Sequence, residues 1–313
     1  MAVVKEKAPA KLSPIESFAL SAVAAVVANT AAAPIERVQL LLQCQGEMLK
    51  QGTISRPYTG MIDCIRQTFR SEGLISFWRG NLATCIRYFP TQAMNFAFKD
   101  HIKTMFKQNK DDPYMVNFAK NVASGGVAGT LSLSFVYSLD YARTRLANDV
   151  KSIKNGGDGR KYNGLVDVYR KTFASDGIVG LYRGFVISCV GIFVYRGCYF
   201  GLYDTLRPMV VRRDPDLTHL AILGYSVTFT SGLISYPINT IRRRMMMTSG
   251  EAVKYKGAMD CMFQIIRNEG PTGLFKGFQV IVLRAVTGAV LLPAFDKLVQ
   301  LYIGITVDTK TSG

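Results

Sequence analysis

Long apolar runs set the pattern of this chain. Six stretches, each about the length that a helix needs to cross a bilayer, cover residues 18–42, 82–105, 118–146, 185–206, 220–241 and 278–303. Charged residues interrupt several of them, as Arg87 does in the second run and Arg284 in the sixth. Charges inside a span normally face a bundle interior or a water-filled path. The pattern therefore predicts six transmembrane helices around a polar interior. A soluble helical protein with buried ion pairs is the alternative.

The polar segments between these runs repeat three times. Each holds a Tyr-x-Gly, an Asp five residues after that Tyr, and an aromatic-basic-Gly triplet 20 residues after it: Tyr58, Asp63 and Trp78; Tyr162, Asp167 and Tyr182; Tyr255, Asp260 and Phe275. Such a period indicates stacked structural repeats. We expect an all-α membrane protein of six transmembrane helices in three parallel repeats with pseudo-threefold symmetry, plus short helices in the loops. The predicted units are a tail (1–15), repeats 16–108, 117–211 and 218–305, and a second tail (306–313).

The repeated glycines suggest a site for anionic lipid. They are Gly60, Gly80, Gly164, Gly184, Gly257 and Gly277. Each is predicted to lie where a helix begins, and free backbone N–H groups at a helix N-terminus attract anions. At a membrane boundary that anion would be a lipid phosphate. The alternative is that these glycines only permit tight turns.

Composition narrows the function. The chain has 313 residues, 49% hydrophobic and 19% charged, with a net charge of +16. This excludes a disordered basic tail, which would be poor in apolar residues. A basic, apolar chain suggests a membrane protein that handles anions or a nucleic-acid binder, and the arginines inside apolar runs argue against nucleic acid. No metal-ligand cluster, phosphate-binding loop or nucleophile–base pair appears, so we expect no metal, no cofactor and no enzyme activity.

Three related motifs end the odd-numbered runs. They are Pro34-Ile-Glu36-Arg-Val-Gln39, Ser138-Leu-Asp140-Tyr-Ala-Arg143 and Pro237-Ile-Asn239-Thr-Ile-Arg242. This pattern resembles the Pro-x-Asp/Glu-x-x-Lys/Arg motif of the mitochondrial carrier family, and the likeness covers nearly the whole chain. The run Arg242, Arg243, Arg244, Met245, Met246, Met247 resembles the hexapeptide of its ADP/ATP carriers. Without the family, that run could be a cationic helix end with a lipid-facing Met patch.

The resemblance implies a monomeric, multi-pass antiporter of the mitochondrial inner membrane that exchanges ADP for ATP by alternating access and binds cardiolipin. It implies a matrix gate of Glu36 with Arg143, Asp140 with Arg242, and a neutral third pair, Asn239 with Gln39, which we expect to be hydrogen-bonded. It also implies a cytoplasmic gate, in which Asp100 pairs with Arg207 and Asp296 with Lys103. Asp204 lacks a charged partner there, because Val299 stands at the position of the expected cation.

Several residues are implied to bind the nucleotide. Arg87 and Arg284 lie nine residues after their aromatics, and the second repeat has Gly191 and Ile192 there. The implied site also includes Lys99, Tyr195, Arg196, Ser235 and Arg242. Tyr195 begins a ladder with Tyr199 and Tyr203, spaced by four, which could line the path or simply pack a helix.

Some positions depart from the family pattern. Asn29 stands where these carriers are expected to hold a phosphate-binding lysine, and Gln39, Asn239 and Val299 each remove a further charge. These losses leave a second hypothesis: a carrier-fold protein with impaired transport that serves as a structural or accessory subunit of an inner-membrane complex.

Overall fold

The computed structural model describes residues 14–105, 112–151, 159–210, 217–251 and 254–281, and this part of the chain contains helices and no strands. Five long helices coincide with the first five predicted runs. The elements are α1 (Pro14–Lys50), α2 (Met61–Glu72), η1 (Leu74–Trp78), α3 (Asn81–Met105), α4 (Tyr114–Ala147), α5 (Leu165–Leu181), α6 (Phe185–Val210), α7 (Leu217–Met247), α8 (Ala258–Glu269) and η3 (Pro271–Phe275). The all-α prediction is confirmed. Most of the sixth run, from residue 282 onward, lies outside the described residues.

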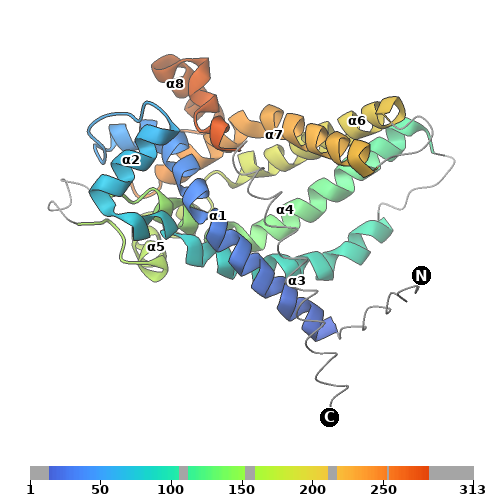
Figure 1. Cartoon of the computed structure of the whole chain (residues 1–313), viewed down its shortest axis with the longest axis horizontal. Helices are drawn as coiled ribbons and strands as arrows, with labels where there is room; N and C mark the ends of the chain where they lie inside the picture. The colour runs from blue at the N-terminus through green and yellow to red at the C-terminus, as the bar shows by residue number, and fades with distance from the viewer. Residues whose placement is uncertain (1–13, 106–111, 152–158, 211–216, 252–253, 282–313) are drawn as a thin grey trace, which may run out of the picture.

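The long helices pack in chain order around a central space. Helix α1 contacts α3, α3 contacts α4, α4 contacts α6, α6 contacts α7, and α7 returns to α1. The short helices α2, α5 and α8 gather near one end of the bundle, where α1, α4 and α7 finish (Figure 1). We call this end the loop end. Two of the long helices, Tyr114–Ala147 and Phe185–Met209, are long and apolar enough to cross a membrane by composition alone.

The repeated aspartates begin the short helices. In α2, a carboxylate oxygen of Asp63 accepts a hydrogen bond from the backbone N–H of Thr59 at 3.0 Å. Asp167 in α5 and Asp260 in α8 make the same bond, at 3.0 and 2.9 Å, to the residue four positions earlier. In Asp63 this backbone hydrogen bond lowers the pKa of the carboxyl group. One side chain per repeat therefore satisfies a backbone donor just outside the helix.

The glycines of the aromatic-basic-Gly triplets have a packing role that the sequence left open. Gly80, Gly184 and Gly277 have φ values of 89°, 85° and 82°, in the region where side chains are strained. A Cβ atom at Gly184 would also lie 3.2 Å from the backbone oxygen of Arg242. The corresponding atoms at Gly80 and Gly277 would lie 3.1 Å from the oxygens of Arg143 and Gln39. Each glycine thus lets one repeat approach the last residue of the next repeat's motif.

The other three glycines differ. Gly60, Gly164 and Gly257 precede α2, α5 and α8 in an extended conformation, and nothing lies within 4 Å of a Cβ placed on them. No side chain caps these helices from the glycine position. The open space occurs here and not at the first set. If glycines of this chain bind lipid phosphate, these three have the room for it.

Candidate functional site

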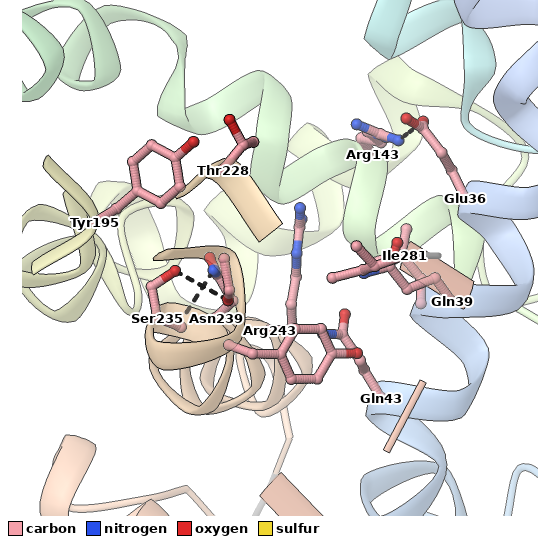
Figure 2. A pocket seen from close by; sticks show the side chains of 13 residues that line it. Glu36, Gln39, Gln43, Arg143, Tyr195, Thr228, Ser235, Asn239, Arg243 and Ile281 are labelled. Carbon is pink, nitrogen blue, oxygen red and sulfur yellow. Dashed lines mark hydrogen bonds and ion pairs between the residues drawn. The ribbon is translucent and has the colours of Figure 1, made fainter. Parts of the chain in front are cut away.

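A cavity of about 590 Å³ lies between α1, α4, α6 and α7 toward the loop end. Figure 2 shows Glu36 and Arg143 on one side, Tyr195 and Thr228 on another, and the guanidinium of Arg243 projecting between them. Its other lining residues are Gln39, Leu40, Gln43, Gly232, Ser235, Tyr236, Asn239 and Ile281. The cavity therefore joins residues from all three repeats.

Glu36 and Arg143 form an ion pair between α1 and α4. Their side chains are only 6% and 11% exposed, and a guanidinium nitrogen of Arg143 donates to the Glu36 carboxylate (Figure 2). This is the first of the three pairs expected for the gate. An ion pair so sheltered from water resists being broken, because separation leaves a buried charge without a partner.

Asp140 holds three arginines at the second junction. It pairs with Arg242, which joins α4 to α7 as expected. A carboxylate oxygen of Asp140 also lies 3.4 Å from Nη1 of Arg243 and 3.9 Å from Nη1 of Arg87. Asp140 is 1% exposed. One carboxylate cannot neutralise three guanidiniums, so this region keeps an excess of positive charge that suits an anion.

The third junction, between α7 and α1, has no ion pair from the motif. Gln39 and Asn239 both line the cavity, but no hydrogen bond joins them in the described structure, so the expected Asn–Gln bond is not formed. The Asn239 amide instead donates to the backbone oxygen of Ser235 at 3.3 Å. The side-chain amide of Asn239 can donate a hydrogen bond to a carbonyl oxygen on its own helix. A carboxylate at this position has no N–H to donate and could not make that bond.

Two hydrogen bonds farther along the chain, one buried in α1 and one part-buried just after it, close this junction. Nε of Arg244 donates to the backbone oxygen of Gln43 at 3.0 Å, and the amide of Gln51 donates to the oxygen of Met247 at 3.0 Å. Arg244 also donates to both carboxylate oxygens of Glu269 in α8. Burial alone would raise the pKa of Glu269, but the hydrogen bonds and charges of Arg244 and Lys276 lower it to about 2.

The hexapeptide at the end of α7 serves several contacts at once. Arg242 and Arg243 face Asp140, and Arg243 also donates to the hydroxyl of Thr144. Met246 and Met247 are 0% and 4% exposed and belong to two different core clusters. A lipid-facing methionine patch is therefore wrong for these two residues. The run ties α7 to α1, α4 and α8.

Some of the remaining residues expected to bind the nucleotide line the cavity, and others pack between helices. Tyr195 and Ser235 line the cavity. Gly191 lies against Ile238 of α7, while Ile192 and Arg196 pack against glycines of α4, so these three do not belong to the lining described above. Tyr195, Tyr199 and Tyr203 form a continuous stack with ring centroids 6.2 Å apart at each step. The ladder thus packs along α6 and presents its first ring to the cavity.

The expected cytoplasmic gate is described only in α6. Arg207 is exposed near the end of α6, and its guanidinium lies 5.9 Å from the ring of Tyr203. Asp204, one turn before, is partly buried. Lys99, Asp100 and Lys103 belong to α3, but their side chains are outside the described part, and Arg284 and Asp296 are outside it altogether.

The cavity also includes residues that the sequence reading missed. Gln43 follows Glu36 by seven positions, two helical turns along the same face, so its spacing from the motif was a usable signal. Thr228, Gly232 and Tyr236 have no comparable signal, because many positions of α7 are equally apolar or small. Among the described residues, no group of three His, Cys, Asp or Glu side chains could hold a metal ion.

Comparison with known proteins decides the family. The chain matches the mitochondrial carrier protein family three times, over residues 10–110, 114–214 and 213–305. It belongs to the mitochondrial carrier family. This carrier is 60% identical over 289 residues to "ADP,ATP carrier protein" of Chlamydomonas reinhardtii, covering 92% of the chain and 94% of that protein. It is 59% identical to "ADP,ATP carrier protein 2, mitochondrial" of Zea mays, over 92% of the chain and 75% of that protein. It is 57% identical to "ADP,ATP carrier protein 3" of Saccharomyces cerevisiae, over 92% and 94%.

Proposed function

We propose that this carrier exchanges ADP for ATP across the mitochondrial inner membrane by alternating access. The observation that supports this most directly is the charge around the cavity. Arg143 and Arg243 line the cavity, and Arg87 and Arg242 lie beside it against Asp140. In the described part of the chain these four guanidiniums face two carboxylates, those of Glu36 and Asp140, an excess of two positive charges. In a site sheltered from water such an excess attracts a polyphosphate strongly. Relatives named as ADP,ATP carriers supply the identity of that polyphosphate.

The ion pairs also indicate how access would alternate. Glu36 with Arg143 and Asp140 with Arg242 join α1 to α4 and α4 to α7 toward the loop end. These two links would form the gate that shuts the cavity on that side. To open there, both pairs must separate. A bound anion can share the arginines with Asp140 and weaken its hold on them. Substrate would thereby lower the barrier between two states that differ by a few kcal/mol.

The alternative, an accessory subunit with impaired transport, has support from the charges lost at Asn29, Gln39, Asn239 and Val299. Gln39 and Asn239 remove one ion pair from the gate. Against it, the other two pairs are intact and the hexapeptide is engaged in full. An identity of 57–60% over 92% of the chain to carriers of an alga, a plant and a yeast also favours transport.

Cardiolipin and the monomeric state belong to the same proposal. The uncapped starts of α2, α5 and α8 at Gly60, Gly164 and Gly257 offer three equivalent places for a lipid phosphate. The cavity is built from the three repeats of one chain. One chain therefore suffices for the site.

Exchange in liposomes tests the function. Purified protein in cardiolipin-containing vesicles loaded with ADP, ATP or GTP should take up labelled ADP when the lumen holds ADP or ATP and much less when it holds GTP. Arg87→Gln should abolish most uptake, whereas Arg170→Gln, which removes an exposed cation on α5, should not. Uptake no faster than in empty vesicles, together with no ADP-dependent rise in the unfolding temperature, would rule out the antiporter.

A further inference from the structure

The hydrogen-bonding of α1 is interrupted at one residue in the helix. Pro34 has no backbone N–H, so it cannot donate to the carbonyl oxygen of Thr30, four positions earlier. A carbonyl freed in this way is where a helix bends or where another group inserts. Glu36 of the gate lies two residues after this proline. The conformation of α1 around Pro34 therefore decides where the Glu36 carboxylate points.

Trp78 supplies the hydrogen bond that the Thr30 carbonyl lacks. Its indole Nε1–H donates to the Thr30 oxygen at 2.8 Å, across 48 residues of sequence. Three residues later, the Asn81 amide donates to the Thr30 hydroxyl at 3.0 Å. The segment that joins η1 to α3 thus holds the interrupted turn of α1 by two hydrogen bonds. An indole N–H is a donor only, so it matches a carbonyl that lacks one.

The same segment also contacts α4 and the loop that follows it. Arg79 donates to Asp149 and to the backbone oxygen of Tyr162. A Cβ at Gly80 would lie 3.1 Å from the backbone oxygen of Arg143, which is the partner of Glu36. Residues 78–81 therefore connect the interrupted turn of α1 with the residue of α4 that pairs with Glu36.

The other two repeats provide internal comparisons. Tyr182, at the position of Trp78, donates through its hydroxyl to Ser134 at 2.8 Å. Ser134 lies four residues before Ser138, which replaces the proline and retains its N–H, so this carbonyl already has a helical donor. In the third repeat Pro237 is present, but Phe275 has no polar atom to donate. Only the first repeat combines a freed carbonyl with an aromatic donor.

We propose that Trp78 is a positioning residue for the gate. Its indole N–H occupies the carbonyl that Pro34 leaves free in α1, and it thereby holds Glu36 where Arg143 can pair with it. Trp78 lies outside the lining of the cavity, so it acts through α1. Its loss should reduce the share of molecules with the loop end shut and leave the substrate contacts intact.

The test compares Trp78→Phe in the wild-type and in a Pro34→Ala background, with Tyr182→Phe as the matched control. Phe keeps the ring and removes the donor, and a hydrogen bond of this kind corresponds to about a fivefold change in an equilibrium. In vesicles with one orientation of the carrier, Trp78→Phe should raise the apparent KM for ADP two- to fivefold, roughly, at the face opposite the loop end. Trp78→Phe should not raise the apparent KM for ADP at the loop-end face, because the shifted equilibrium favours the state in which the loop end is open.

In the Pro34→Ala background the restored N–H takes the carbonyl, so Trp78→Phe should change either KM by less than about twofold. Tyr182→Phe should also have an effect of less than about twofold. Equal effects of Trp78→Phe in both backgrounds, or an equal rise at both faces, would overturn the proposal, because loss of packing alone would produce them.

A second measurement needs neither the Trp78 variant nor transport. Trp78 is the only tryptophan of the chain, so intrinsic fluorescence reports its environment directly. Pro34→Ala should shift its emission maximum, since a helical N–H then competes for the Thr30 oxygen; Pro237→Ala, in the repeat with Phe275, should not. An unchanged emission in Pro34→Ala would overturn the proposal. The transport readout rests on the proposed ADP/ATP exchange, but the fluorescence comparison does not, so their failures are distinguishable.

Discussion

Rebuilding the missing ion pair at the third junction should slow the exchange cycle. The change is Gln39→Lys together with Asn239→Asp. Both residues line the same cavity on facing helices, α1 and α7, and neither is held by the other. The pair would add a third link across the loop end, beside Glu36 with Arg143 and Asp140 with Arg242. The state with that end shut should become more stable, and opening should become slower.

The magnitude follows from the position of the two residues. Two unit charges about 4 Å apart attract by ~4 kcal/mol at the effective dielectric of a partly sheltered site. Desolvation of both groups cancels much of this, which leaves about 1–2 kcal/mol net. If opening of the loop end limits the cycle, the maximal exchange rate should fall about five- to thirtyfold. The apparent KM should change less, because the arginines around Asp140 are untouched.

A double-mutant cycle on the maximal rate of ADP exchange separates the pair from its parts. Asn239→Asp alone would place a carboxylate four residues before Arg243, with which it can pair along α7. Gln39→Lys alone would add a cation without a partner. We expect a coupling energy of about 1–2 kcal/mol between the two changes. If the rate of the double variant equalled the value expected from multiplying the effects of the two single changes, the two residues would not be coupled. The third junction would then not be part of the gate.

Three further outcomes are expected. Arg87→Ala should weaken the apparent affinity for ADP at least about tenfold, through loss of a charge-assisted contact, and unchanged kinetics would place Arg87 outside the site. Gly184→Val should lower the free energy of unfolding by about 2–4 kcal/mol, because the position combines a positive φ with a close backbone oxygen. Gly257→Ala, at a position in open space, should change the free energy of unfolding little in lipid-free detergent. Glu269→Gln should destabilise the carrier by ~2 kcal/mol after allowance for solvent screening. Because the folded pKa of Glu269 is lowered to about 2, its contribution is complete above the unfolded pKa and disappears as pH falls from about 4.5 to 2. Thermal unfolding of wild type and Glu269→Gln across that range should therefore converge at low pH.

Much of this protein could be read from its sequence. The apolar runs predicted the long helices, because a membrane-spanning helix needs a continuous apolar surface whatever its neighbours are. The threefold period predicted the repeats, and the resemblance of the motifs to those of the mitochondrial carrier family implied that Glu36 and Arg143 would pair. The first two inferences depend on periodicity along the chain, whereas the pairing depends on a local motif that resembles that of the family.

The tertiary structure decided what the side chains do once the helices have met. Nothing in the sequence pattern indicated that Asp140 would hold Arg87 and Arg243 as well as Arg242, because Arg87 lies in α3 and the other two lie in α7, far from Asp140 in sequence. The sequence suggested an Asn239–Gln39 bond, and the amide found a closer acceptor on its own helix. Nor could spacing show that Trp78 completes the turn of α1 broken by Pro34, since residues 48 positions apart meet only when the bundle is packed. Symmetry places residues at equivalent positions, but hydrogen bonds and charges are shared according to distances that only the folded chain defines.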